Sequence, residues 1–151
     1  MHSVIDPLIV GLGTPSRLEI HMEEIETYYP GVHAQVSITD RWIQVQHQQV
    51  WLDRAGLKRF VDQVSTWVRA REIEAHLEGM SPQEFTLDLD LHGRARNVRV
   101  RYTLQTMIPD ERGPITHTVS GVFDLNMEYV LQLIDDVKRM FMQLERVWAS
   151  G

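Results

Sequence analysis

Apolar and polar residues alternate through much of the first third of the chain, and this two-residue period is typical of half-buried β-strands. The apolar positions are Leu18, Ile20 and Met22, then Val32, Ala34, Val36 and Ile38, then Ile43 and Val45. Turn-forming residues separate these runs at 28–31 and at Asp40-Arg41. The pattern predicts three strands joined by hairpins, and Leu8–Val10 adds a candidate short strand before them.

Matching apolar residues across each turn predicts the registers of the hairpins. A turn at Asp40-Arg41 pairs Ile38 with Ile43, Val36 with Val45 and Ala34 with His47. In the first hairpin, Ile25 pairs with Ala34 whereas Met22 pairs with Val36, and both pairs are possible only if that strand holds one extra residue. We therefore predict a β-bulge at Glu23-Glu24.

The apolar period changes to that of a helix after Asp53, a residue that caps helix N-termini well. Apolar residues recur at helical spacing at Leu57, Phe60, Val61, Val64, Trp67 and Val68. They predict a helix of about 18 residues. A second helix, of about 22 residues, is predicted after Asn126. Its apolar positions are Val130, Ile134, Val137, Phe141, Leu144 and Trp148.

Between the two helices, alternating runs from Ala75 to Phe123 predict a second group of strands. A connection at Gly93–Arg96 pairs Leu91 with Val98, Leu89 with Val100, Leu87 with Tyr102 and Phe85 with Leu104. The same register sets Asp90 opposite Arg99 and Asp88 opposite Arg101, and such facing charges contribute about 0.2–1 kcal/mol per pair. Because the apolar and the charge patterns choose one register independently, this hairpin is the best-defined part of the predicted fold.

The predicted order of elements is β-β-β-α-β-β-β-β-α. Hairpin connections make neighbouring strands antiparallel, and both helices carry an apolar face that needs a sheet to cover it. We therefore expect a single α+β domain over residues 1–151, in which residues 1–16 are the more loosely ordered part. Its core is expected to be one antiparallel sheet of six or seven strands with the two helices packed on one face.

Composition and charge narrow the classes of function. The chain is 43% hydrophobic and 24% charged, as in ordinary soluble proteins, and it has no cysteine for disulfides, thiolate metal sites or nucleophiles. No signal peptide is visible, and no run approaches the ~20 apolar residues of a membrane span, so we expect a cytoplasmic protein without a membrane partner. The net charge of −6 argues against nucleic acid, whose phosphates need a clustered positive surface.

The histidines are the main candidates for catalysis. The predicted registers place His47 and His117 on the apolar face, where they could form a metal pair or a general acid and base. The more common explanation is a core histidine whose ring is hydrogen-bonded, and no carboxylate lies at ligand spacing beside either residue. Phosphate-binding glycine motifs and serine-nucleophile motifs are also missing. We therefore expect no cofactor, no metal and no catalytic residue.

Two groups of residues are candidates for binding a protein partner. Glu23, Glu24 and Glu26 precede Tyr28 and Tyr29, so carboxylates could attract a basic partner and tyrosines could anchor it. The more common explanation of such charges is protection of an edge strand against aggregation. Uncharged polar residues also line the outer face of the second hairpin, at Gln35, Ser37, Gln44, Gln46 and Gln48. They could bind a partner at small desolvation cost, although water contact is the more common role. The candidate partner-binding residues are Glu23, Glu24, Glu26, Tyr28, Tyr29, Trp42, Gln44 and Gln46.

Three segments carry a resemblance to a known family: VWLDRAGLKRF at residues 50–60, LEGMSPQEF at 77–85, and VSGVFD at 119–124 before the last helix. Together they resemble small bacterial immunity proteins of polymorphic toxin systems, particularly the wall-associated-toxin immunity (WapI-like) family, over residues 32–140. The resemblance implies a cytosolic protein that binds a cognate toxin domain and blocks its active site or its assembly. It assigns a role to no individual residue, and residues 1–31 lie largely outside it.

Three hypotheses of function follow. The first is an immunity-type protein that binds and neutralises a cognate bacterial toxin domain without catalysis. The second is a non-catalytic scaffold or assembly module, which associates with itself, for example as a homodimer, through a sheet edge or the long helix. The third is a small enzyme that uses His47 or His117.

Overall fold

A computed structural model describes residues 5–11, 14–81, 83–92 and 97–151, apart from the side chain of His47. The strands are β1 (Leu8–Val10), β2 (Arg17–Glu26), β3 (Gly31–Asp40), β4 (Ile43–Asp53), β5 (Glu74–Glu78), β6 (Phe85–His92), β7 (Asn97–Ile108) and β8 (Ile115–Leu125). The helices are α1 (Arg54–Ala70), the 3₁₀ turn η1 (Met127–Tyr129) and α2 (Val130–Ser150). This order agrees with the predicted one, with β1 as the additional short strand.

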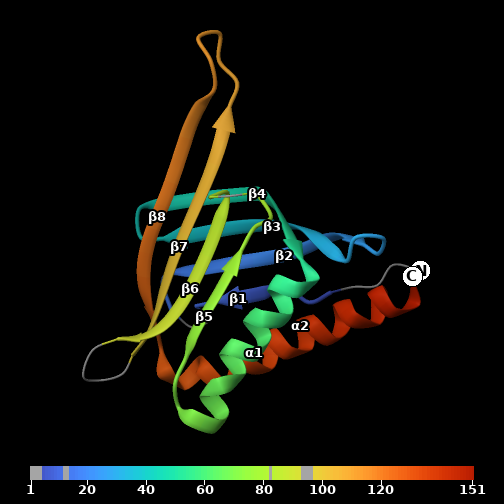
Figure 1. Cartoon of the computed structure of the whole chain (residues 1–151). Helices are drawn as coiled ribbons and strands as arrows, with labels where there is room; N and C mark the ends of the chain where they lie inside the picture. The colour runs from blue at the N-terminus through green and yellow to red at the C-terminus, as the bar shows by residue number, and fades with distance from the viewer. Residues whose placement is uncertain (1–4, 12–13, 82, 93–96) are drawn as a thin grey trace.

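The strands form two antiparallel sheets, with the orders β1-β2-β3-β4 and β5-β6-β7-β8. The expectation of one continuous sheet is therefore wrong. The chain leaves the first sheet through α1, and β5 then pairs with β6 rather than with β4. Figure 1 shows the strands of the first sheet running across those of the second. Alternation reports only that one face of each strand is buried, and two sheets that share a core give the same alternation as one sheet beneath helices.

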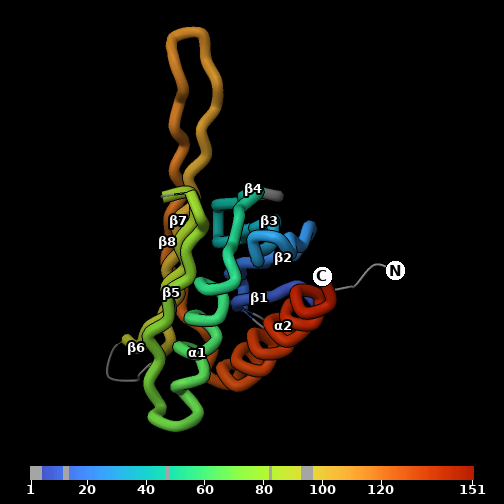
Figure 2. The backbone as a smooth tube through the Cα atoms, turned by 45° about the vertical axis from the view of Figure 1, so that its right-hand side comes forward, coloured from blue at the N-terminus to red at the C-terminus, as the bar shows by residue number. Residues whose placement is uncertain are grey.

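Both sheets and both helices contribute to one hydrophobic core. α1 packs against β5, β4 and α2, while α2 packs against β1 and β2, so the helices join the two sheets (Figure 2). The predicted cap of α1 is confirmed, because the Asp53 side chain accepts a hydrogen bond from the Gly56 N–H at 3.1 Å. None of the helices in the described ranges is both long and apolar enough to cross a membrane.

The register predicted for β6 and β7 is confirmed at every described pair, from Phe85 opposite Leu104 to Leu91 opposite Val98. The connection at 93–96 lies outside the described residues. The expected ion pairs across this hairpin do not form among the described side chains: Asp88 pairs with His76 at 2.6 Å, and a buried Asp90 oxygen has no hydrogen-bond partner. The aspartates thus face the arginines as predicted, Asp88 opposite Arg101 and Asp90 opposite Arg99, but no ion pair between these described side chains stabilises the register.

The predicted bulge in β2 is confirmed between Met22 and Glu24, but both hairpin registers of the first sheet differ from the prediction by two residues. Ile38 pairs with Val45 rather than with Ile43, because the connecting turn is the short Arg41-Trp42. Arg41 adopts a φ of 57°, the left-handed conformation that such tight turns require. A shift of two residues keeps every side chain on its predicted face, so the apolar pattern does not detect it.

A second irregularity lies in β4, opposite the segment Val36–Ile38 of β3. It sets Ala34 opposite Val50, whereas the sequence predicted His47 there. It also places Gln48 opposite Val36, so Gln49 rather than Gln48 continues the outer row beside Gln35.

β7 and β8 continue beyond the rest of the molecule as a two-stranded arm (Figure 1). His117 lies on this arm, opposite Thr106, and it is exposed to solvent. The prediction that His117 belongs to the apolar core is therefore wrong. His117 is in phase with Val119, but this end of β8 extends beyond the core. The side chain of His47 lies outside the described residues, so the pairing of the two histidines has no structural support.

A buried polar link joins the two sheets at the end of β3. The Asp40 carboxylate accepts hydrogen bonds from the Tyr102 hydroxyl at 2.6 Å and from the Ser16 hydroxyl at 2.8 Å. Gly121 of β8 leaves room for the Tyr102 hydroxyl, which a side chain at this position would displace. Burial, and then the hydrogen bond to Asp40, raise the pKa of Tyr102 far above its usual value, so this hydroxyl stays protonated and donates to Asp40.

Candidate functional site

The turn between β2 and β3 carries the candidate site, and the two helices hold its base. The Arg54 N–H, at the start of α1, donates to the carbonyl of Pro30 at 2.9 Å. The Trp148 indole, near the end of α2, donates to the carbonyl of Gly31 at 3.3 Å. These two hydrogen bonds fix the backbone at Pro30 and Gly31, directly after Tyr28 and Tyr29.

Glycine is required at the base of this turn because Trp51 lies across it. A Cβ atom on Gly31 would lie 2.6 Å from Cζ2 of Trp51 and 2.8 Å from the carbonyl oxygen of Leu52. Any larger residue would therefore push Trp51 away from β3. The absence of a side chain at Gly31 lets the indole pack close to the strand and face the site.

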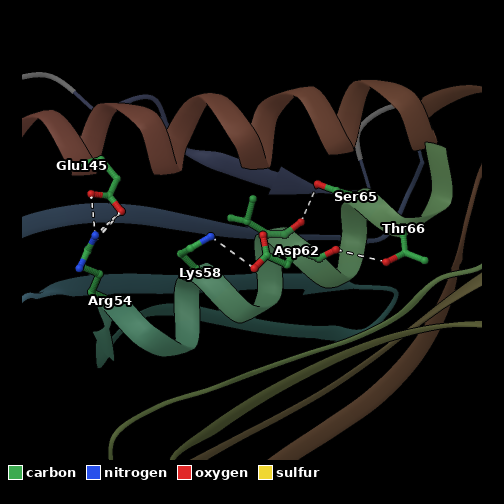
Figure 3. Close-up of polar contacts among 7 residues, drawn as sticks. Arg54, Lys58, Asp62, Ser65, Thr66 and Glu145 are labelled. Atoms are coloured by element: carbon green, nitrogen blue, oxygen red, sulfur yellow. Dashed lines mark hydrogen bonds and ion pairs between the residues drawn. The ribbon is translucent and has the colours of Figure 1, made fainter. Parts of the chain in front are cut away.

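An ion pair between the helices reinforces the same region. The Arg54 guanidinium donates to both oxygens of Glu145, at 2.9 and 3.0 Å, as Figure 3 shows. Its Cζ also lies 6.0 Å from the centroid of the Trp148 ring, a distance at which cation–π attraction operates. This bidentate ion pair links the start of α1 to the end of α2, next to the hydrogen bond between Trp148 and Gly31.

We define the tip cluster as Glu24, Glu26, Tyr28, Tyr29, His33 and Trp51. Strand pairing brings three of its members into one row across the outer face of the sheet, because Glu24 pairs with His33 and His33 pairs with Trp51. The ring centroids of His33 and Trp51 lie 4.4 Å apart, and those of the two tyrosines lie 4.8 Å apart, edge to face. The aromatic side chains therefore contact one another in two pairs, one edge to face and one tilted.

The tip cluster is open to solvent and slightly concave. Tyr28 is 85% exposed and Tyr29 is 74% exposed, although large aromatic side chains are usually covered. A depression of about 470 Å³ lies between Glu26, Tyr28, Tyr29, His33 and Trp51. Its walls combine flat aromatic surface with a carboxylate, which suits a cationic side chain from a partner.

Negative charge gathers at the tip cluster. One ligand atom each from Glu24, Glu26 and His33 lie within 4.8 Å of one another, and all three residues are exposed. A zinc ion would need bonds of about 2.0–2.2 Å to all three, so these side chains would first have to move together. As they stand, they supply acceptors and negative charge on the surface rather than a closed coordination shell.

The structure divides the eight candidate partner-binding residues between the two ends of β3. Glu23, Glu24, Glu26, Tyr28 and Tyr29 lie at or beside the tip cluster, and Glu23 stands at the bulge without a register partner. Trp42, Gln44 and Gln46 lie at or after the turn at the opposite end, where Trp42 is 97% exposed. The ten residues of β3 span about 30 Å between the two groups. One small contact cannot use both groups.

Sequence reasoning missed a second polar group, on the outer face of the β5–β6 sheet. His76 Nδ1 lies 2.6 Å from Asp88, and its Nε2 lies 3.2 Å from Glu78. The hydrogen bond to Asp88 is the main reason why the pKa of His76 is raised above 6.5. With both ring nitrogens held by carboxylates, this histidine is a charged strand-to-strand link rather than a free general base. The sequence does contain a signal for this group. His76 and Glu78 alternate with Ala75 and Leu77, so they lie on the outer face, next to the strand predicted at 85–91.

His76 provides a pH-dependent prediction. A histidine whose pKa is raised on folding stabilises the fold fully below its usual pKa of 6.5, and this contribution is lost as the pH rises through the raised value. We expect His76→Gln to lower the free energy of unfolding by about 0.2–1 kcal/mol at pH 6, the range for solvent-exposed ion pairs, and by less at pH 9. Urea denaturation at both pH values measures this. In an Asp88→Asn background, the effect of His76→Gln on the free energy of unfolding should differ less between pH 6 and pH 9. If this difference is unchanged, Asp88 is not the main partner of His76.

Comparison with known proteins assigns no role to the tip cluster, so its role is inferred from its side chains. The resemblance of residues 32–140 to WapI-like immunity proteins stays an expectation that rests on the three sequence segments. No protein-family model matches the chain, and no curated protein matches it significantly.

Proposed function

We propose that this domain is an immunity-type protein, which binds a cognate bacterial toxin domain through the tip cluster and neutralises it without catalysis. The observation that carries the proposal is the pair of exposed tyrosines, Tyr28 and Tyr29, beside carboxylates on a base held by both helices. The sequence resemblance to immunity proteins supports the same class of function.

The arrangement of the tip cluster favours tight binding for a physical reason. Tyrosine is enriched among the few interface residues that supply most of the binding free energy. It also loses little conformational freedom on binding, because only two side-chain torsions must be fixed. The backbone beneath the tyrosines is already held by Pro30 and Gly31, so less ordering is needed when a partner arrives.

Charge defines the kind of partner. Glu23, Glu24 and Glu26 crowd one exposed strand end, and the whole chain carries a net charge of −6. Such a surface attracts a basic protein surface over a distance and speeds the encounter. We therefore infer that the toxin domain presents lysine or arginine side chains to the tip cluster.

Removing the negative charge should slow association. We expect Glu24→Gln with Glu26→Gln to lower the association rate constant about 10-fold at low ionic strength, with a smaller effect on dissociation. The loss should fade as salt is added, because salt screens exposed charges. Stopped-flow or surface-plasmon measurements over a salt series would show both effects.

The matched control removes two exposed carboxylates elsewhere, as Glu72→Gln with Glu111→Gln. This variant carries the same net charge as the first and should keep most of the association rate. If the two variants slow association equally, overall charge rather than the tip cluster controls the encounter, and the assignment of the surface fails.

Co-expression tests the function itself. Cells that produce the toxin domain encoded beside this chain should survive when the chain is co-expressed, and the two proteins should purify as a complex. The complex should form with the chain alone and need no added cofactor or substrate. Survival without a complex, or a complex without protection, would contradict neutralisation by binding.

A further inference from the structure

β8 is the outermost strand of its sheet, and its unpaired side lacks the features that normally protect such an edge. Strand edges are usually shielded by charged side chains, proline, bulges or a covering element. The stretch from Ile115 to Phe123 contains no Lys, Arg, Asp, Glu or Pro. It pairs with β7 without a register shift. Val122 is 47% exposed and Ile115 is 44% exposed, so apolar surface accompanies the open backbone.

The other outermost strands in the described part of the chain are protected. β1 has three residues and packs against α2. β5 is short and acidic at both ends, and the Gln63 side chain of α1 accepts from the His76 N–H at 2.8 Å. β4 has a register irregularity, and the Met80 N–H donates to its Trp51 carbonyl at 2.8 Å. The long regular edge of β8 therefore differs from the rest.

We propose that β8 pairs antiparallel with β8 of a second copy of this chain, with Val119 facing itself at the twofold axis. With Val119 on the axis, every residue of the stretch 115–123, which has no Lys, Arg, Asp or Glu, faces a residue of the same stretch in the other copy. A centre one residue later would set Thr116 opposite Asp124 and leave the uncharged stretch out of step. The symmetric pairing closes the edge and stops further strand addition.

The projecting arm supports a second copy as the partner. The half of the paired stretch that lies on the arm, 115–118, meets the half that lies on the body of the other copy, 120–123. Each arm, which protrudes from its own chain, thus gains a surface to lie on. Ile115 then faces Phe123 of the other copy, and Thr116 faces Val122. The paired stretches would share about eight to ten backbone hydrogen bonds.

An exposed aromatic residue stands near the same edge. The Asp40 carboxylate lies next to Gly121, and the Arg41-Trp42 turn follows directly. In the proposed pairing, His117 on the arm of the other copy lies opposite Gly121. Trp42, which is 97% exposed, can therefore cover that arm. This gives Trp42 a role although it lies far from the tip cluster.

The proposed dimer is independent of the proposed function. The turn that carries the tip cluster and the β8 edge lie at opposite sides of the molecule in Figure 1. Pairing through β8 leaves both tip clusters free, so a dimer would bind two toxin domains. Either proposal can fail while the other stands.

A charge-exchange experiment tests the pairing. The proposed register sets Thr118 opposite Ser120 of the other copy, while within the chain they face Gln105 and Thr103. Multi-angle light scattering should give twice the 17.6 kDa of one chain for the wild type. Thr118→Glu with Ser120→Glu places like charges across the axis and should weaken dimerisation at least 10-fold. Thr118→Glu with Ser120→Lys places opposite charges across it and should restore the dimer.

Single cysteines provide a second readout, because the natural chain has none. Val119→Cys should form a disulfide-linked dimer under mild oxidation, since the two thiols face each other. Thr116→Cys should not, because the two copies of this position would lie about 20 Å apart, six residues at ~3.3 Å per residue along paired strands. A monomeric wild type, equal masses for the two charge variants, or equal cross-linking from both cysteines would overturn the proposal.

Discussion

Replacing Tyr28 and Tyr29 together by alanine is expected to weaken binding of the toxin domain by about 100- to 1,000-fold. The two rings are largely exposed and stand on a fixed base, so truncation removes the anchors without disturbing the fold. The free energy of unfolding should change by less than ~0.5 kcal/mol, as for other exposed positions. Titration calorimetry of the complex and urea denaturation of the free domain measure the two quantities.

Trp42→Ala is the matched control for this experiment. Trp42 is also a large exposed aromatic residue, but it lies at the other end of β3. Its replacement should change toxin affinity less than about 3-fold. An equal loss from both variants would show that the toxin contacts another surface or the whole face of the sheet.

Asp40→Ala is expected to lower the free energy of unfolding by about 2–4 kcal/mol. Asp40 is 6% exposed, and its carboxylate is the acceptor for two buried hydroxyl groups, those of Tyr102 and Ser16. Without it, both donors stay buried without this partner, and the two sheets lose their polar link. Urea denaturation followed by circular dichroism measures the loss.

Two further variants make the Asp40 prediction specific. Tyr102→Phe removes one donor but leaves Asp40 bonded to Ser16, so it should cost about 1–2 kcal/mol. Asp124→Ala removes an exposed carboxylate from the end of β8 and should cost less than ~0.5 kcal/mol. If Asp40→Ala lowers the free energy of unfolding as little as Asp124→Ala, the buried link does not stabilise the contact between the sheets.

The sequence predicted best where two patterns acted on the same residues. In the β6–β7 hairpin, apolar side chains and facing charges required one register, and that register is present. The bulge near Glu24 was also predictable, because apolar residues on either side of it fall out of phase. Both predictions depended only on residues within a single hairpin, which are close together in the sequence.

Other features depended on geometry that alternation does not carry. Near their turns, the hairpins of β2, β3 and β4 are shifted by two residues from the predicted registers, and such a shift leaves each face unchanged. The irregularity in β4 then moves Gln48 off its predicted outer face. The division into two sheets depends on the path of the chain through α1. Asp40 looked like an ordinary turn residue, and its burial appears only when Tyr102, from the other sheet, is brought to it.

The candidate site was half visible in the sequence. The glutamates and tyrosines are consecutive, so their grouping could be read directly. His33 and Trp51 join them through strand pairing. The predicted pairing of Ala34 with His47 sets Gln48 opposite His33, three residues away from Trp51, the observed partner. Trp42 was grouped with the tyrosines by residue type alone, although a whole strand separates them.

Site-specific cross-linking would show whether the bound toxin domain lies against the tip cluster. A photoreactive label on Thr27→Cys, in the β2–β3 turn, should form a covalent adduct with the bound toxin domain, detected by mass spectrometry. The same label on Trp42→Cys should form little or none. An adduct from position 42 and none from position 27 would contradict the account.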